Sequence, residues 1–466
     1  MRALALLTGA ALTAALAACG SGEDDRGGFL VAPACPRAAA PSAARAPAGT
    51  IVVTGREQQR IEGWGASVVG DTEVEPLVDP VGLHPAQLRE LDRLVFDVAQ
   101  INLVRVFGPG FGHARVTATA AQRRSDESFA FMRRVAPYGV RFMYTGARAP
   151  TALQDGSRLR AGAEAAYGRW IAAYLRFARD AIGVPFSFAA VANEPDNLKS
   201  RLVMTPAQSA AVYAALARAL AASGQATKLI LGDTTGWSTA CPYLAAQLGA
   251  RLGPRAAAAA SHAYVGSGAD AASLAELAGR ARLPVWQTEW GTGCPTCGEE
   301  DSMHLATRWS QRIATDLIAG RAAAWFAFRA VADSTHGPGD ALIVRERANR
   351  GRPWIVTRRF DVLRQYTSVA PPGARRLDVR TGVGGVRAVA FRVGDRVSLV
   401  VTSVEHSRSR RARIYLGPGA GRLTARRTSE RLRFAALPAR PYAGRPVPVT
   451  LPPESVTTYT LTARRG

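Results

Sequence analysis

Short apolar runs alternate with amphipathic stretches between residue 60 and about residue 366, with a period of roughly forty residues. Each unit begins with an apolar run, passes through a loop rich in Gly, Pro, Asn and Asp, and continues into a stretch with helical periodicity. The predicted strands are Ile61–Val69, Ile101–Phe107, Val140–Thr145, Phe186–Asn193, Leu229–Thr234, Ala257–Tyr264, Val285–Glu289 and Ala323–Phe328. The predicted helices are Pro85–Ala99, Gln122–Ala136, Ala161–Ile182, Pro206–Ser223, Pro242–Leu252, Ala269–Gly279, Met303–Ile318 and Ile355–Tyr366.

Eight such strand–helix units predict an α/β fold, namely a (β/α)8 TIM barrel over residues 49–366. The strands are almost continuously apolar, which is typical of a parallel sheet that is buried on both faces. The main competitor is a doubly wound open sheet, which would show a Gly-rich phosphate-binding turn after its first strand. Gly63-Trp64-Gly65 is too short for that pattern, so the barrel is favoured.

The pattern changes after Pro371-Pro372-Gly373, where short runs with alternating polarity replace the helical periodicity. These runs predict a C-terminal antiparallel β-sandwich over residues 367–466, to which Thr50–Thr54 can add a strand from ahead of the barrel. The predicted strands of this second domain are Val386–Val393, Arg396–Ser403, Arg411–Leu416, Val447–Leu451 and Val456–Thr462.

The N-terminal segment has the features of an export signal rather than of a folded element. Residues 1–18 combine a basic start with a short Ala/Leu stretch, and Leu16-Ala17-Ala18-Cys19-Gly20 resembles a bacterial lipobox. That resemblance implies that Cys19 is lipidated and tethers an exported protein to the membrane at the cell surface. The alternative is an ordinary signal peptide in which Cys19 has no role. Residues 19–48 are predicted to form a flexible tether.

The chain carries a formal charge of +23, nearly all of its basic residues are arginine, and Lys199 and Lys228 are the only lysines. From Thr357 to the end there are 22 Arg but only 6 Asp and Glu. One interpretation is attraction to an anionic surface polymer, lipid headgroup or glycan. The favoured alternative is a compositional bias toward arginine on an ordinary surface, since the arginines are scattered. Nucleic acid is excluded as a partner because an exported chain without a binding motif has little use for it.

Four cysteines remain besides the proposed lipid anchor, and an exported protein can join them as disulfides. Cys294-Pro-Thr-Cys297 has the spacing of half a zinc site or of a redox pair. Neither a second ligand pair nor a thioredoxin-like setting is evident, so a disulfide that staples a loop is favoured. The pairing among Cys35, Cys241, Cys294 and Cys297 cannot be deduced from the sequence.

Two glutamates occupy the ends of predicted strands, in Ala192-Asn193-Glu194-Pro195-Asp196 and in Trp286-Gln287-Thr288-Glu289-Trp290. Glu194 ends the fourth strand and Glu289 ends the seventh, and these strands face each other across the mouth of a TIM barrel. The chemistry of such barrels lies at the C-terminal ends of the strands. A pair of opposed carboxylates is the minimum equipment for cutting a glycosidic bond.

These motifs resemble the clan A retaining glycoside hydrolases, and within that clan the best match is glycoside hydrolase family 30. In the clan an Asn-Glu-Pro motif after strand four carries the acid/base, and a glutamate at the end of strand seven is the nucleophile. The similarity covers roughly residues 50–466. The segments that carry it, besides Asn193-Glu194-Pro195, are Gln59-Arg60-Ile61-Glu62-Gly63-Trp64-Gly65, Trp286-Gln287-Thr288-Glu289 and Gly337-Pro338-Gly339.

The resemblance implies that Glu194 is the acid/base and Glu289 the nucleophile of a retaining hydrolase of β-linked glycans. The neighbouring carboxylate is expected to raise the pKa of Glu194 so that it stays protonated. Asn193 is expected to bind the substrate 2-hydroxyl, Arg105 to keep Glu289 ionised, and Tyr264 to orient Glu289. No metal or organic cofactor is expected, and the protein is expected to be a monomer whose partner is a carbohydrate.

Aromatic residues near the strand ends are candidate platforms for a sugar face, with Trp325 preferred and core packing as the alternative for each. The other candidates are Trp64, Trp237 and Trp290. His262 is predicted either to contact substrate or to be a structural histidine. The third strand ends in Tyr144-Thr145-Gly146-Ala147-Arg148, where relatives usually have a Ser-Pro-Trp-like segment. Tyr144 and Arg148 can therefore recognise a different substrate, and Arg148 weakly indicates an acidic sugar.

A second hypothesis is that the chain is a surface lipoprotein that binds glycan on a degenerate barrel without cutting it. The intact pair Glu194 and Glu289 argues against a pure binder. The identity of the sugar, its linkage, and endo- against exo-cleavage depend on loop shape, which the sequence does not reveal.

Overall fold

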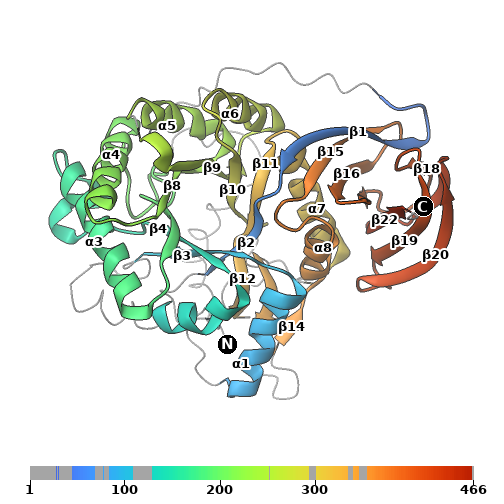
Figure 1. The fold of residues 1–466 in the computed structure, drawn as a ribbon, viewed down its shortest axis with the longest axis horizontal. Coiled ribbons are helices and arrows are strands. Elements are labelled where there is room, and N and C mark those ends of the chain that lie inside the picture. Colours follow the sequence, from blue (N-terminus) through green and yellow to red (C-terminus); the bar gives the residue numbers. More distant parts are fainter. Residues whose placement is uncertain are drawn as a thin grey trace, which may run out of the picture.

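Eight parallel strands close into a barrel in the computed structural model (Figure 1). The structure describes residues 28, 30, 45–68, 77, 83–108, 128–250, 252–292, 301–333, 340–345 and 354–463. The barrel strands are β2 (Gly63–Val68), β3 (Leu103–Phe107), β4 (Arg141–Thr145), β7 (Phe186–Ala190), β8 (Lys228–Gly236), β9 (Ala256–Val265), β10 (Val285–Trp290) and β11 (Ala322–Ala327). Each overlaps a predicted strand, and the predicted (β/α)8 barrel is confirmed.

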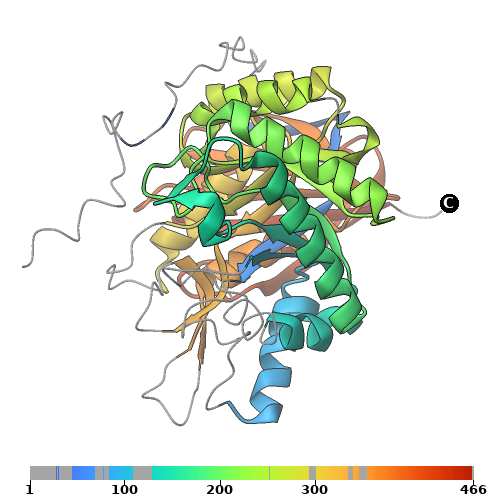
Figure 2. The ribbon, with the colours of Figure 1, turned by 90° about the vertical axis from the view of Figure 1, so that its left-hand side faces the viewer.

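Helices cover the outer face of the barrel, and Figure 2 shows the green helices of this layer crossing in front of it. They are α1 (Pro85–Asp92), which continues as the π-helix η2 (Arg93–Val98), a helix over 128–135, α3 (Glu164–Ile182), α4 (Pro206–Ala222), α5 (Trp237–Gly249), α6 (Gly268–Arg280), α7 (Met303–Ile318) and α8 (Arg358–Thr367). Thr205 caps α4 as predicted, in a capping box with Gln208. In contrast, α5 begins at Trp237 rather than at Pro242. Gly236 is its N-cap, and Pro242 lies inside the helix.

The barrel interior is filled by side chains, because alternate residues of every strand point inward. Its inner cluster comprises Leu103, Met143, Phe188, Ala190, Ile230, Ala258, Ala260, Trp286, Ala323, Ala324 and Phe326. The opposite residues of the strands pack against the helices in a larger core. The inner cluster fills the middle of the barrel. Polar side chains that point inward near the C-terminal ends of the strands therefore lie together at that end, on top of this apolar layer.

A nine-stranded, mostly antiparallel sheet forms the second domain, at the right of Figure 1, where its C-terminal strands are orange to red and β1 is blue. Its strands are β1 (Thr50–Arg60), β15 (Arg375–Thr381), β16 (Val386–Val393), β17 (Arg396–Ser403), β18 (Arg410–Tyr415), β19 (Ala420–Thr428), β20 (Ala435–Ala443), β21 (Val447–Leu451) and β22 (Ser455–Ala463). Thr50–Thr54 lies in β1, which pairs with β15 and β18. The sequence did not predict β20, because Pro438 and Pro441 argue against a strand; β20 is an edge strand, where proline is tolerated.

Helices α7 and α8 lie between the barrel and this sheet (Figure 1). The Oγ of Ser310 on α7 lies 2.6 Å from Thr402 Oγ1 on β17, and Gln365 on α8 donates to Thr428 Oγ1 on β19 at 2.9 Å. Smaller sheets complete the described fold: β12 (Arg329–Asp333) with β13 (Ala341–Arg345) and β14 (Trp354–Val356), and β5 (Gln154–Asp155) with β6 (Arg158–Leu159).

Two predictions about the chain ends and cysteines fall largely outside the described residues. Cys19, Cys35, Cys294 and Cys297 are not described, whereas Cys241 is disulfide-bonded. The pairing therefore stays open. Among the described residues, no helix combines the length and the apolar character that a membrane crossing requires.

Candidate active site

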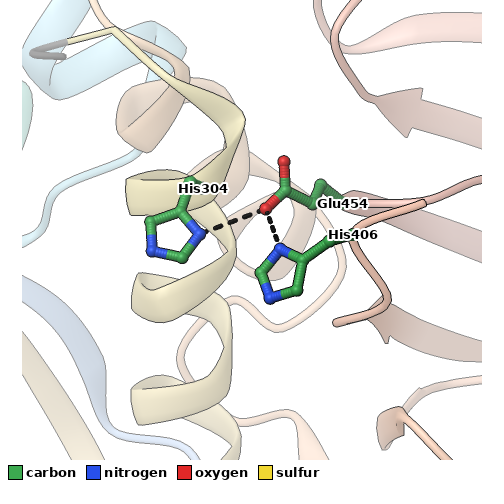
Figure 3. Close-up of side chains that lie close together, drawn as sticks. All are labelled: His304, His406 and Glu454. Atoms are coloured by element: carbon green, nitrogen blue, oxygen red, sulfur yellow. Dashed lines mark hydrogen bonds and ion pairs between the residues drawn. The ribbon is translucent and has the colours of Figure 1, made fainter.

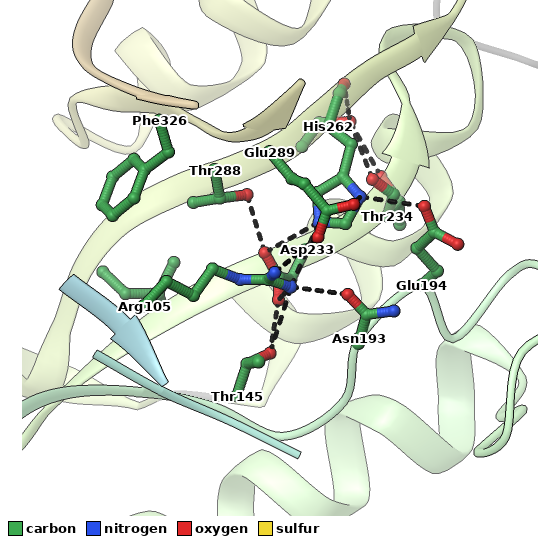
Figure 4. Close-up of polar contacts among 12 residues, drawn as sticks. Arg105, Thr145, Asn193, Glu194, Asp233, Thr234, His262, Thr288, Glu289 and Phe326 are labelled. Atoms are coloured by element: carbon green, nitrogen blue, oxygen red, sulfur yellow. Dashed lines mark hydrogen bonds and ion pairs between the residues drawn. The ribbon is translucent and has the colours of Figure 1, made fainter. Parts of the chain in front are cut away.

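Glu194 and Glu289 meet at the C-terminal end of the barrel (Figure 4). Glu194 lies just beyond β7, and Glu289 lies in β10. Glu194, His262 and Glu289 each contribute one side-chain atom to a group whose members all lie within 4.8 Å of one another. The fold therefore brings together the two carboxylates that the sequence predicted to face each other. It also places the imidazole of His262 beside both of them, which the sequence did not predict.

Glu289 is held by the two residues that the sequence placed beside it. Arg105, which points inward from β3, donates from Nη1 to Glu289 Oε2 at 2.6 Å. Tyr264, on β9, donates its hydroxyl to Glu289 Oε1 at 3.0 Å. Both oxygens of this nearly buried carboxylate thus have a fixed donor, which orients the group.

Glu194 is held from the other side of the mouth and is more accessible. His262 Nδ1 lies 2.9 Å from Glu194 Oε1, and Asn197 Nδ2 donates to Oε2 at 2.9 Å. The side chain of Glu194 is 14% exposed, against 6% for Glu289. The Glu194 backbone has φ +49 and donates its N–H to the Asp233 carbonyl at 2.9 Å. A left-handed backbone at a non-glycine residue is strained, which is typical of functional sites.

Asp233, at the end of β8, is a functional residue that the sequence reasoning missed. Its carboxylate is fully buried and accepts hydrogen bonds from Arg105 Nη2 at 2.9 Å, Thr145 Oγ1 at 2.6 Å and Thr288 Oγ1 at 2.7 Å. Burial alone would raise the pKa of Asp233, but the charge of Arg105 and the hydrogen bond from His262 hold that pKa far below its ordinary value. The signal was available, because Asp233 is the next-to-last residue of the predicted strand Leu229–Thr234 and so lies close to a strand end, as the two glutamates do.

Arg105 connects the whole group, because its guanidinium reaches six side chains, including Ser67 Oγ at 3.5 Å and His262 Nε2 at 3.2 Å. Besides Glu289 and Asp233, Nη2 lies 2.6 Å from the Asn193 side-chain oxygen and 3.4 Å from Thr145 Oγ1. Since Arg105 occupies the amide oxygen of Asn193, the amide nitrogen is the group through which Asn193 would donate to a substrate hydroxyl. The buried arginine is balanced by two carboxylates, as a buried cation must be.

His262 is buried between the acidic groups and the Arg105 guanidinium, whose Nη2 lies 3.2 Å from His262 Nε2. Burial alone would lower its pKa, but the charge of Glu289 and hydrogen bonds with Asp233 and Glu194 outweigh burial and raise the pKa of His262 to about 10. Its Nε2 faces Asp233 Oδ1 at 3.5 Å, while Nδ1 faces Glu194. The structure therefore places His262 inside the carboxylate cluster, in contact with Glu194.

The two glutamates do not have the protonation order that the sequence suggested. Burial raises the pKa of Glu289, and the negative charge of Glu194 adds to that increase, against the charges of His262 and Arg105. Burial would raise the pKa of Glu194 as well, but the hydrogen bond and charge of His262 lower it below its ordinary value. The expected increase at Glu194 is therefore wrong, because the sequence did not reveal that His262 lies against this carboxylate.

Because the pKa of His262 is raised, the free energy of unfolding should decrease as the pH rises into the alkaline range. Because the folded-state pKa of about 10 exceeds the ordinary imidazole value of about 6.5, its contribution is complete below pH 6.5 and is lost as pH rises toward 10. We expect the wild-type free energy of unfolding to fall by a few kcal/mol over that interval. His262→Gln should flatten the dependence in urea unfolding measured from pH 6 to 10. Equal slopes for the two proteins would contradict a charged His262.

The tryptophans expected to support a sugar are core residues in the structure. Trp325 is fully buried because β11 points Ala324 and Phe326 into the barrel and Trp325 outward, where its Nε1 donates to Asp316 Oδ2 at 3.0 Å. Trp237 donates to the other oxygen of Asp316. The remaining candidates are also buried: Trp64 donates to the Ala370 carbonyl, and Trp290 packs on Trp309 and Trp325. The platform prediction is wrong for all four, and the core-packing alternative holds.

Trp325→Phe should therefore affect stability and not substrate affinity. The change removes an indole N–H from buried Asp316, and we expect a loss of about 1–3 kcal/mol in the free energy of unfolding, with KM unchanged within about twofold. Denaturant unfolding and steady-state kinetics measure the two effects. Trp170→Phe, which alters a half-buried indole stacked on Tyr174, is the control with little expected effect on either. A large rise in KM for Trp325→Phe would instead indicate that Trp325 contacts the sugar.

The third-strand segment also differs from expectation. Tyr144 points away from the barrel interior and is buried against Tyr174 and Phe186, so it is not positioned to contact a sugar. Arg148 is half-buried, and both burial and the neighbouring charge of Arg201 lower its pKa. A pocket of about 160 Å³ opens beside Glu194, and its lining residues are Ala147, Asn193, Glu194, Asn197, Lys199, Ser200 and Arg201.

The spacing of Glu194, His262 and Glu289 would also suit a metal ion, but the charges oppose one. Arg105 already pairs with Glu289 Oε2. The raised pKa of His262 favours a proton on the ring nitrogen whose lone pair a metal would need. The geometry therefore fits proton and nucleophile chemistry by carboxylates better than it fits a metal centre.

Comparisons with known proteins agree with this geometry. Residues 164–346 match the family model described as "Glycosyl hydrolase catalytic core", and the matched segment contains Glu194, Asp233, His262 and Glu289. No curated protein matches the sequence. With this match and the paired carboxylates, the protein is an enzyme of the glycoside hydrolase class, and its substrate is a carbohydrate.

Solved structures resemble the fold over most of the chain, at low sequence identity. A family 30 endoxylanase from Clostridium papyrosolvens C71 has a TM-score of 0.67 at 17% identity, covering 89% of this chain and 100% of that one. An endo-β1,6-glucanase has a TM-score of 0.68 at 15% identity, covering 90% and 95%. A glucosidase from Croceicoccus marinus has a TM-score of 0.60 at 16% identity, covering 90% and 100%. The shared barrel-plus-sheet fold therefore serves enzymes with different substrates.

Proposed function

We propose that the protein cleaves β-linked glycans with retention of anomeric configuration, as a member of glycoside hydrolase family 30. One observation carries the proposal: a carboxylate oxygen of Glu194 lies within 4.8 Å of one of Glu289. Retaining enzymes hold their carboxyl groups about 5–5.5 Å apart, whereas inverting enzymes leave about 6.5–9.5 Å for a water molecule. This close approach of one oxygen from each carboxylate supports direct attack by a carboxylate.

Glu289 is the proposed nucleophile. Its Oε2 is paired with Arg105 and its Oε1 with Tyr264, so the carboxylate is held in one orientation for attack on the anomeric carbon. The attack breaks the glycosidic C–O bond and forms a glycosyl ester on Glu289, while Glu194 gives a proton to the departing oxygen. Water then attacks the anomeric carbon, Glu194 takes a proton from that water, and the bond from this carbon to Glu289 breaks so that Glu289 leaves as a carboxylate.

His262 is the proposed source of the proton that Glu194 needs. In the ligand-free protein the imidazolium lowers the pKa of Glu194, so this carboxylate begins as an ion. The Nδ1 proton of His262 lies on the 2.9 Å contact with Glu194 Oε1 and can shift to the carboxylate when substrate displaces water. Asp233 faces the Nε2 side of the ring and keeps the imidazole oriented during this transfer.

The anomeric form of the first product tests the retaining assignment. A panel of aryl β-glycosides and cell-wall polysaccharides identifies a substrate, and proton NMR then follows the anomeric signal from the start of hydrolysis. The β-anomer should appear first and convert slowly to the α-anomer. Initial appearance of the α-anomer would mean inversion and would overturn the assignment.

The pocket beside Glu194 carries positive charge where the leaving part of the substrate would lie. Among the described residues, Lys199 and Arg201 both line it, together with Glu194. This charge supports a glycan with acidic substituents on the leaving-group side. The substrate panel should therefore pair each neutral polysaccharide with its uronate-bearing counterpart, and turnover of the neutral member alone would contradict this preference.

Export and anchoring are proposed on the sequence features alone. The lipobox-like Leu16-Ala17-Ala18-Cys19-Gly20 supports lipidation at Cys19, with residues 19–48 as a tether that places a monomeric enzyme at the cell surface. The competing idea of a non-catalytic glycan binder is not favoured, because Arg105, Asp233 and His262 hold an intact carboxylate pair that mere binding does not require.

A further inference from the structure

A second cluster of ionisable side chains lies outside the barrel mouth, between the two domains (Figure 3). His304 is the second residue of α7, His406 lies between β17 and β18, and Glu454 immediately precedes β22. The Nδ1 atoms of His304 and His406 lie 3.1 and 2.7 Å from the same oxygen, Glu454 Oε1. All three of these atoms lie within 4.8 Å of one another. Residues from three distant parts of the sequence thus aim at one point.

The two residues contributed by the sheet domain are held by its backbone. Ser403, which ends β17, pairs directly with Ser455, which begins β22, and His406 and Glu454 follow and precede that pair. The Glu454 N–H donates to the Glu405 carbonyl at 2.8 Å. Glu454 has φ +40, a strained backbone that turns its side chain toward α7. The turn between the two strands therefore fixes the backbone from which Glu454 extends toward α7.

We propose that His304, His406 and Glu454 form a binding site for a divalent transition metal of the zinc type. Imidazole nitrogen and carboxylate oxygen are ligands that zinc prefers, at about 2.0–2.2 Å in a tetrahedral arrangement. Such bond lengths place neighbouring ligand atoms roughly 3.3 Å apart. The distances of 3.1 and 2.7 Å from the two Nδ1 atoms to Glu454 Oε1 are slightly shorter than this spacing. A small outward movement of the two imidazole rings would therefore admit the ion.

Exposure favours a metal over a simple ion pair at this place. The side chains of His304, His406 and Glu454 are 48%, 69% and 25% exposed, and an exposed pair contributes little to stability by itself. The same exposure lets water complete the coordination of an ion held by three protein ligands.

The site would join the barrel to the sheet domain, because His304 belongs to α7 and the other two ligands to the sheet (Figure 3). Its role is structural and separate from the chemistry at Glu194 and Glu289. Binding replaces any Nδ1 protons that the two imidazoles direct at Glu454, so it releases protons and weakens in acid.

Zinc binding to the full-length protein, stripped with EDTA and kept free of reductant, tests the proposal. Isothermal titration with zinc chloride and thermal melting with and without zinc are measured for wild type, His304→Ala, His406→Ala and Glu454→Gln. The wild type should gain at least about 2 °C in melting temperature with zinc. Each variant should bind zinc at least about tenfold more weakly at this site and lose that gain. His84→Ala removes an exposed histidine elsewhere; it loses the N-cap of α1 and should melt at a lower temperature, but its zinc affinity and its gain in melting temperature with zinc should equal those of wild type.

Every outcome of this experiment bears on the site. Loss of one zinc equivalent and of the melting shift in all three variants, but not in His84→Ala, supports it. Three outcomes overturn it: no zinc-dependent shift in wild type, the same shift in every variant, or variants that are destabilised equally with and without zinc. The last result would identify an ion pair only.

Discussion

Glu289→Ala should lose nearly all turnover, by at least about 10⁴-fold in kcat, on every substrate tested. The change removes the atom that attacks the anomeric carbon, and it leaves the charge of Arg105 unbalanced on that side of the site. Good leaving groups cannot compensate, since the bond to the nucleophile no longer forms. Steady-state kinetics on an aryl β-glycoside and on a polysaccharide measure the effect.

Glu62→Gln is a matched control for this loss. Glu62 precedes β2, at the opposite end of the barrel, and accepts a hydrogen bond from Trp286 Nε1 at 2.6 Å that glutamine can also accept. Its turnover should stay within about threefold of wild type. Turnover of Glu289→Ala near the wild-type rate would remove Glu289 from the mechanism.

Glu194→Ala should divide substrates by their leaving group. Without a proton donor, natural glycans with poor leaving groups should lose about 10²–10⁴-fold in kcat, whereas an activated aryl glycoside should still form the glycosyl ester on Glu289. That ester should then accumulate, because no base activates water. Azide needs no base, so it should restore turnover by about tenfold or more and yield a β-glycosyl azide.

Two comparisons make the Glu194 result specific. Azide should not accelerate the wild-type enzyme, in which Glu194 already activates water, and it should not rescue Glu289→Ala to a β-linked product. An azide-rescued α-linked product from Glu194→Ala would reverse the two roles. Equal losses on all leaving groups would exclude Glu194 as the acid/base.

The architecture was predictable because strand hydrophobicity and the order of elements depend on local sequence. All eight barrel strands overlap predicted ranges, and α7 has the predicted bounds Met303–Ile318. The strands β15, β19 and β20 escaped prediction, because their many arginines and prolines leave few apolar positions from which a strand can be recognised.

The site was predictable only as far as strand ends determine it. Glu194 and Glu289 were found because each ends an apolar run before a turn. Asp233 also lies close to a strand end but is in no recognised motif. Trp325 was misplaced because the choice of inward or outward face depends on one residue of register, and Phe326 takes the inward position.

The protonation states could not be read from the sequence at all. His262 and Glu194 are 68 residues apart, and only their 2.9 Å contact reveals that an imidazolium lowers the pKa of the carboxylate. That contact depends on closure of the whole barrel, since β9 carries His262 and Glu194 follows β7.

Trapping the glycosyl-enzyme tests the central claim most directly. The protein is incubated with a 2-deoxy-2-fluoro β-glycoside of the sugar found in the substrate panel, digested, and mapped by tandem mass spectrometry. We predict one fluoroglycosyl group per chain, attached to Glu289, and no label on Glu289→Ala. Rapid hydrolysis of natural substrate without any adduct, or a label on another residue, would contradict the account of Glu289 as the nucleophile of a retaining enzyme.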